Sequence, residues 1–175
     1  LYDRLYQKLP AFTKGYLDAI IAAQQQVYGE FLIPGLLNDT ILSDMQKSVP
    51  YAPNEDGIET PRYIYANYFL ARKLAELDRT AILKKLSAVH QVKLYTNNPP
   101  PQLPKVENMG AIDYYEIMPL VFQHSKINLN ITLRSIQKGI PLRAFDIMGS
   151  GGFLQTNYQE DFLNYFVPGE DFIYY

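Results

Sequence analysis

The 175-residue sequence predicts an α/β fold: a parallel sheet flanked by helices, preceded by a mainly helical N-terminal region. Two observations carry this prediction. Apolar residues recur at helical spacing through most of residues 1–90, whereas short β-rich runs alternate with helical stretches over 91–175. Such alternation is typical of βαβ units, in which the strands are parallel. We therefore expect two domains, a helical region at 1–90 and an α/β half at 91–175.

The first part is expected to be built from short and long helices in succession. The clearest is 13–28, where apolar residues recur three and four positions apart until Gly29 provides a stop signal. A linker at 48–61, rich in proline and glycine, separates the earlier helices from the later ones. Asp78 stands where an N-cap would open a new helix. In order, the expected helical stretches are 13–28, around 36–37, 41–45, 62–77 and 79–89.

The second part alternates strands with helices. The run NNPPPQLP at 97–104 is too rich in proline for regular structure. Asp113 and Glu116 have the spacing of a capping box, and Pro119 suits the first turn of the helix that follows. The expected strands are 92–96, 105–110, 126–132, 152–156 and 171–175, with helices ending at 125, around 142–150 and at 159–166.

Composition and charge exclude several classes of function. Apolar residues make up 47% of the chain and charged residues 19%, which is typical of a globular protein. The formal net charge is −2 and the basic residues are scattered, so no nucleic-acid partner is expected. The sequence has no cysteine, and its two histidines, His90 and His124, leave little for a metal site. Each histidine is expected at a helix end.

The expected location follows from the same inventory. No apolar run approaches the roughly 20 residues that a membrane helix needs, and the first residues lack the pattern of a signal peptide. The lack of cysteine is compatible with a reducing compartment. A cytoplasmic protein is therefore expected. The chain has no initiator Met and stops at an apolar, strand-like run, so we also expect a fragment.

The strand at 126–132 has a polar face. Its apolar residues alternate strictly with three polar ones, Asn128, Asn130 and Thr132. Central parallel strands are usually apolar on both faces. The polar face therefore indicates either an edge strand open to water, or a crevice in which the side-chain amides bond a ligand or a neighbouring loop.

The stretch RAFDIMGSGG, which begins at Arg143, supports two interpretations. Helical spacing places Arg143, Asp146 and Ser150 on one face. The opposite, buried face is expected to hold Leu142, Phe145 and Met148. In the structural interpretation an exposed ion pair, worth about 0.3–0.5 kcal/mol, precedes glycines that end the helix. In the functional one, the guanidinium binds phosphate, the carboxylate accepts ribose hydroxyls, and Gly151 and Gly152 let the ligand approach closely.

The same stretch carries a family resemblance. From about Gly110 onward the chain resembles the C-terminal, donor-binding domain of GT-B glycosyltransferases, more narrowly the spore maturation protein CgeB-like family. The residues that carry the resemblance are 125–162, SKINLNITLRSIQKGIPLRAFDIMGSGGFLQTNYQEDF. Within them, FDIMGSGGFLQT is similar to the pattern E-A-M-A-x-G-x-P-V-V of many retaining members. Asp146 stands at the acid and Gly151 at the glycine, and Phe153 replaces the proline. Lys138 stands where those members have a second acid, so no contact with the donor sugar is carried over.

The resemblance implies a Rossmann-like domain that binds a nucleotide-diphosphate sugar at the carboxyl ends of its strands. It implies that Arg143 neutralises the diphosphate and Asp146 holds the ribose. Asn128, Asn130 and Thr132 would line the sugar or phosphate side. Cationic side chains and helix N-termini would stabilise the departing nucleoside diphosphate, so neither a cofactor nor a metal is expected. The resemblance assigns no catalytic residue.

The full-length protein is accordingly expected to be a two-domain GT-B glycosyltransferase that transfers a sugar to an unknown acceptor, in spore-surface or cell-surface polysaccharide synthesis. Its expected partners are the nucleotide sugar, the acceptor and a missing N-terminal domain, without which the fragment should be inactive. Exposed Tyr and Leu faces of the region 1–90 would favour a homodimer. The alternative is a non-catalytic α/β protein-interaction module. Arg143 and Asp146 distinguish the two functions, because donor binding would depend on both.

Overall fold

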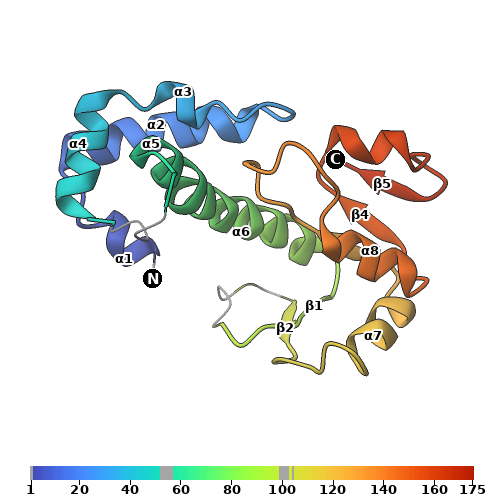
Figure 1. Ribbon diagram of the computed structural model, residues 1–175. Coiled ribbons are helices and arrows are strands. Elements are labelled where there is room, and N and C mark those ends of the chain that lie inside the picture. The colour runs from blue at the N-terminus through green and yellow to red at the C-terminus, as the bar shows by residue number, and fades with distance from the viewer. Residues whose placement is uncertain (1, 52–56, 99–102, 104) are drawn as a thin grey trace. The chain divides into compact units, whose positions relative to one another are not determined.

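The computed structural model describes residues 2–51, 57–98, 103 and 105–175 (Figure 1). Contacts within the chain divide it into two compact units. Unit 1 consists of Leu1–Glu76 and Leu133–Gln137, and unit 2 of Leu77–Thr132 and Lys138–Tyr175. The two domains expected at 1–90 and 91–175 stay a prediction. Parts of the expected linkers, 52–56, 99–102 and 104, lie outside the described residues.

The N-terminal region is helical, as predicted. Its elements are α1 (Tyr2–Tyr6), α2 (Ala11–Gln26), α3 (Ile33–Leu36), α4 (Asp39–Ser48), α5 (Pro61–Ile64), the π-helical turn η1 (Tyr65–Leu70) and α6 (Ala71–Val89). The expected N-cap at Asp78 is wrong, because α6 continues through this residue. An N-cap needs a non-helical backbone, and the strong helix formers around Asp78, such as Ala and Leu, keep the backbone helical.

Local hydrogen bonds explain where two helices of unit 1 begin and how a third one ends. The Asn38 side chain accepts the Ile41 N–H at the start of α4, and Thr60 caps α5 in the same way. Arg134 reaches the end of α2, where its guanidinium donates to the carbonyls of Gln24 and Val27. This contact supplies donors to a helix C-terminus and explains why 133–137 belong to unit 1. The largest fully buried side chains of this unit are Leu17, Ile33, Leu37, Ile41, Met45, Leu70, Leu74 and Gln24.

Unit 2 contains parallel sheets, which confirms the α/β class. The strands β1 (Val92–Leu94) and β2 (Val106–Asn108) form one parallel pair. The strands β3 (Asn128–Asn130), β4 (Leu154–Thr156) and β5 (Phe172–Tyr174) form a second parallel sheet in that order. The described strands are shorter than expected and belong to two sheets.

Helices cover the three-stranded sheet. These are α7 (Met118–His124) and α8 (Leu142–Gly149), with the 3-10 turn η2 (Glu160–Asn164) where an α-helix was expected at 159–166. Because parallel strands need a crossover, α8 carries the chain from the carboxyl end of β3 back to the amino end of β4 (Figure 1). The buried cluster between these elements consists of Ala144, Ile147, Leu154, Phe162 and Phe172.

The expected buried face of α8 is wrong in two of its three positions. Leu142 is 80% exposed and Phe145 is 47% exposed, whereas Ala144 and Ile147 are buried in the core. Met148 is partly buried against the same cluster. Neighbouring residues of a helix are about 100° apart, and both stripes of α8 are apolar, so hydrophobicity alone does not tell which stripe faces the sheet.

Candidate functional site

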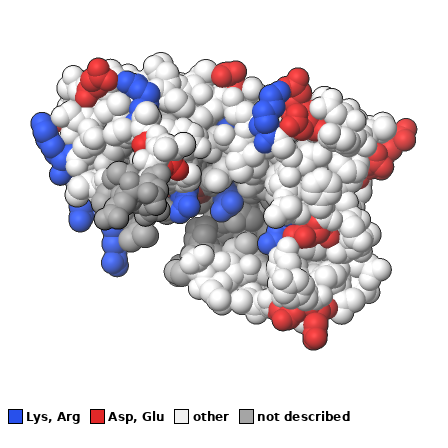
Figure 2. Space-filling view, in the orientation of Figure 1, with Lys and Arg blue, Asp and Glu red and all other residues white. Residues whose placement is uncertain are grey.

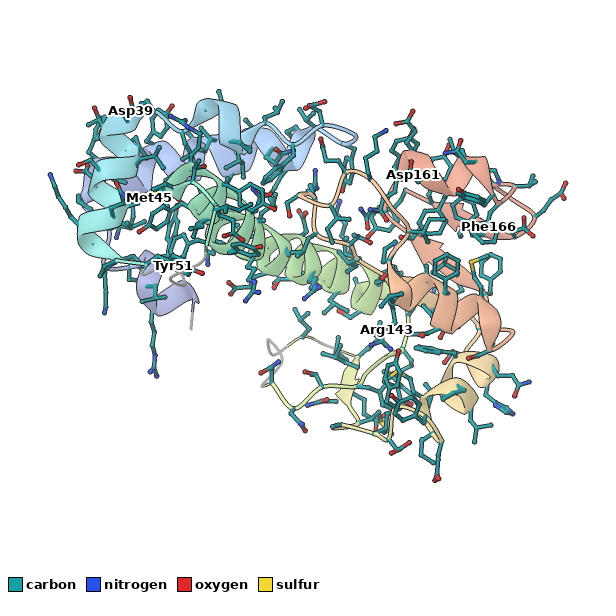
Figure 3. All side chains as sticks on the ribbon, viewed as in Figure 1. Asp39, Met45, Tyr51, Arg143, Asp161 and Phe166 are labelled. Carbon is teal, nitrogen blue, oxygen red and sulfur yellow. The ribbon has the colours of Figure 1, made fainter. Side chains whose placement is uncertain are left out.

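Arg143 and Asp146 lie in the first two turns of α8, on a side of the helix that approaches α7 and the turn before it. Figure 3 labels Arg143 where α8 faces the yellow segment of the chain that contains α7. Since α8 starts on the carboxyl side of β3, both residues lie toward the edge of the sheet where open α/β folds bind their ligands.

The carboxylate of Asp146 has two partners. The hydroxyl of Tyr114 donates a hydrogen bond of 2.6 Å to Oδ2 of Asp146. Nη1 of Arg143 lies 3.9 Å from the same oxygen, and the two side chains are 42% and 30% exposed, respectively. The ion pair expected from their spacing is therefore present but long and partly solvated, so its contribution to stability is small. The hydrogen bond to Asp146 raises the pKa of the Tyr114 phenol, which keeps the phenol protonated and able to donate.

The guanidinium of Arg143 lies among soft and aromatic partners. It donates to the sulfur of Met118, and its central carbon is 5.5 Å from the ring centre of Tyr114 and 5.7 Å from that of Phe122. A thioether is a weak acceptor. The described neighbours therefore hold the guanidinium in place while leaving it able to bind a stronger acceptor, such as a phosphate oxygen.

Tyr114 is a residue of this site that the sequence reasoning missed. It lies in a turn held by Asp113, whose Oδ1 accepts the N–H groups of Tyr115 and Glu116, and whose carbonyl accepts the Met118 N–H. The capping interaction predicted between Asp113 and Glu116 is therefore present on the Asp113 side. The signal in the sequence was the pair of tyrosines placed directly after a turn-forming aspartate.

The polar face of β3 is buried, although β3 lies at an edge of the described three-stranded sheet. Asn128, Asn130 and Thr132 are each 7% exposed, so the interpretation of a face open to water is wrong. Parallel register places Asn130 beside Thr156, and the Asn130 amide donates to the hydroxyls of Thr132 and Thr156. The Thr132 N–H donates to the side chain of Asn157. The amides therefore bond neighbouring segments, which was the second interpretation, and a role in ligand binding stays a prediction.

The two glycines are explained by the end of α8. Gly151 has a φ of 76°, its N–H donates to the Met148 carbonyl, and the Gly152 N–H donates to the Ile147 carbonyl. These bonds form a Schellman motif, which satisfies the last carbonyls of a helix. A Cβ on Gly152 would lie 2.7 Å from both the Asn128 amide nitrogen and the Phe122 carbonyl oxygen. Close contact with protein atoms, rather than with a ligand, thus accounts for the glycine.

The predicted site residues therefore fall into separate groups. Arg143 and Asp146 meet at the start of α8, and Ser150, which was expected on their face, donates to the Asp146 carbonyl one turn further on. Asn130 and Thr132 meet at the carboxyl ends of β3 and β4. The third group, at the amino ends of these strands, is Asn128, Gly151 and Gly152.

The two histidines lie outside these three groups. His124 is the last residue of α7 and His90 directly follows α6, so both lie at helix ends, as predicted. Within the described part of the chain, no three His, Asp or Glu residues come together in a way that could hold a metal ion. None of the described helices is both long enough and apolar enough to cross a membrane. On the face shown in Figure 2, acidic and basic side chains are interspersed.

Comparison with known proteins identifies the family. A family model described as glycosyl transferase-like matches residues 72–175, which include α7, α8 and both described sheets. Neither the curated proteins nor the solved structures yield a match. The matched region also contains Tyr114, Arg143 and Asp146, the three residues that meet at the start of α8. The chain therefore belongs to the glycosyl transferase-like family.

Proposed function

We propose that unit 2 binds a nucleotide-diphosphate sugar at the start of α8, as the donor of a glycosyl transfer reaction. The family supports glycosyl transfer in general, which needs a sugar donor and an acceptor. The observation that carries the proposal is the contact of Arg143, Asp146 and Tyr114 on a partly exposed face within the matched region. It combines a cation for phosphate, a carboxylate for ribose hydroxyls and an aromatic ring.

The charges at the start of α8 favour the binding of an anion next to Arg143. Arg143 is the second residue of the helix, and the first turn contains no acidic residue. A cation at a helix N-terminus is opposed by the helix dipole, whereas an anion bound there is stabilised by the dipole and by the guanidinium together. Stabilisation of a departing diphosphate by these groups needs no metal, so donor binding should persist in the presence of a chelator.

The finer assignment extends this proposal. In a GT-B enzyme of the CgeB-like group, unit 2 would be part of the donor domain, and the acceptor would bind a second Rossmann-like domain. A spore-surface or cell-surface polysaccharide would then be the product. Asn130 and Thr132 would act on the donor site indirectly, because their hydrogen bonds fix the carboxyl ends of β3 and β4.

Calorimetric titration with UDP, GDP and TDP sugars, with and without EDTA, tests donor binding. We expect one of these donors to bind, and Asp146→Ala and Arg143→Ala to weaken it roughly 10-fold or more, because each removes charge-assisted hydrogen bonds. Glu170→Ala and Lys126→Ala, both at exposed positions of unit 2, make the same changes in charge and serve as controls. No binding by the wild type, or equal binding by Asp146→Ala, would contradict the proposal.

The alternative function, a non-catalytic interaction module, is favoured by one observation. Leu142, Phe145 and Tyr165 expose 80%, 47% and 75% of their surface, respectively, and are large apolar or aromatic side chains of unit 2. Exposed apolar surface of this kind is typical of interaction sites. A chain that binds no nucleotide sugar, and that self-associates or binds a partner until Leu142 and Phe145 are replaced by serine, would support this function instead.

A further inference from the structure

Tyr114 contacts both charged residues of the proposed donor site, Asp146 through its hydroxyl and Arg143 through its ring. The hydroxyl donates to Oδ2 of Asp146 at 2.6 Å, and the ring is close enough to the Arg143 guanidinium for a cation–π contact. The side chain is nevertheless 43% exposed, and its neighbour Tyr115 is 84% exposed. A partly exposed tyrosine thus holds the carboxylate of Asp146 through a single hydrogen bond.

This position of Tyr114 is fixed by the backbone around it. Oδ1 of Asp113 accepts two N–H groups of the turn, from Tyr115 at 2.9 Å and from Glu116 at 2.6 Å. The Met118 N–H closes the turn on the Asp113 carbonyl at 2.9 Å. Tyr115 packs edge-on against Tyr114, with ring centres 5.1 Å apart. A turn with this many internal bonds presents the Tyr114 ring to α8 at little conformational cost when a ligand arrives.

The chemistry of the two partners makes their contact exchangeable. A ribose that donates both of its hydroxyls to the Asp146 carboxylate, one to each oxygen, competes with the Tyr114 phenol for Oδ2. The ring that remains offers a face on which any nucleobase can stack. Because this hydrogen bond lies at a partly exposed surface, water can replace it on the phenol once a ligand has taken the carboxylate.

We propose that Tyr114 is a nucleoside-binding residue: its ring forms one wall of the base and ribose site, and its hydroxyl holds Asp146 until a ribose hydroxyl replaces it. This inference rests on the proposed donor site. It assigns ribonucleoside diphosphates as the class of ligand, because only a sugar with both the 2′ and the 3′ hydroxyl can bind both oxygens of the Asp146 carboxylate and so replace the phenol on Oδ2.

Two substitutions of Tyr114 separate the effect of the hydroxyl from that of the ring. Tyr114→Phe removes the competing hydroxyl and keeps the ring, so UDP, or whichever nucleoside diphosphate binds the wild type, should bind roughly 3- to 10-fold more tightly. Tyr114→Ala also removes the stacking face and should bind roughly 10-fold more weakly than Tyr114→Phe. The gain of Tyr114→Phe should vanish for the corresponding 2′,3′-dideoxynucleoside diphosphate, which has no hydroxyl to offer Asp146. Calorimetric titration measures the affinity in each case.

Tyr165→Phe and Tyr165→Ala are the matched controls, since Tyr165 is 75% exposed and lies next to η2. Neither should change the affinity, and thermal melts should show that all four variants fold. If Tyr114→Phe binds no more tightly than the wild type, or gains equally for the dideoxy ligand, the hydroxyl does not compete with ribose. If Tyr114→Ala binds like Tyr114→Phe, the ring is no wall of the site. Failure of the wild type to bind any nucleoside diphosphate would instead overturn the proposed donor site itself.

Discussion

At the scale of the residue, the question for Asn130 is whether its side-chain amide serves stability or binds a ligand. Its amide donates to two buried hydroxyls, at 2.9 Å and 3.0 Å, and the residue is 7% exposed. Buried polar groups that lose their partner carry the full cost of desolvation. We therefore expect substitution of this side chain to lower stability first.

We expect Asn130→Ala to lower the free energy of unfolding by about 2–3 kcal/mol, since two hydroxyls lose a donor. Asn130→Asp should lower it further at neutral pH, because it buries a charge that cannot donate. Urea unfolding followed by circular dichroism measures both, with the exposed pair Asn164→Ala and Asn164→Asp as controls that should stay within about 0.5 kcal/mol. Loss of donor binding by Asn130→Ala without loss of stability would show a direct ligand contact instead.

At the scale of the element, the end of α8 joins the helix to β4 through three glycines in different environments. Gly149 ends α8, and a Cβ there would meet open space. Gly151 has a left-handed backbone, and a Cβ on Gly152 would lie too close to the backbone of α7. These environments predict three different effects of the same substitution.

Gly149→Ala should stabilise the protein by about 0.5–1 kcal/mol, because alanine favours the helix. Gly151→Ala should destabilise it by about 1–2 kcal/mol through its positive φ. Gly152→Ala should cost about 1–3 kcal/mol or more, because the Phe122 carbonyl must move. Thermal and urea unfolding rank the three variants. Near-native stability of Gly152→Ala combined with loss of nucleotide binding would show that the glycine serves the ligand after all.

At the scale of the whole molecule, the two compact units differ in what they contain. Unit 1 has a core of its own and a pocket whose lining includes Asp39, Thr60 and Arg62. Unit 2 contains both parallel sheets and the face formed by Tyr114, Arg143 and Asp146. The family match begins at residue 72 and so includes all of unit 2. We therefore place donor binding in unit 2 and assign no ligand to unit 1.

The order of helices and strands could be predicted from the sequence, because the spacing of apolar residues within a short segment indicates whether it forms a helix or a strand. The parallel pairing of β3 with β4 followed from the helix between them. What could not be predicted depends on contacts between distant residues. The burial of the polar face of β3 needs Thr156 and Asn157 as partners, and these lie about 25 residues away.

The candidate site was predictable only in part for the same reason. The approach of Arg143 and Asp146 follows from helical spacing, a local rule. The hydroxyl of Tyr114 comes from a turn 32 positions earlier in the chain, so no spacing rule connects it to Asp146. The stripe of α8 that faces the core likewise depends on the sheet, which selects Ala144 and Ile147 over equally apolar neighbours.

The most direct test of the central claim is a titration of the ¹⁵N-labelled chain with the best-binding nucleoside diphosphate, followed by amide chemical shifts. We predict saturable shifts in the turn around Tyr114 and in the first two turns of α8, and their loss in Asp146→Ala. Shifts confined to unit 1, for example at Asp39 and Arg62, or no shifts at concentrations that saturate glycosyltransferases, would contradict donor binding at the start of α8.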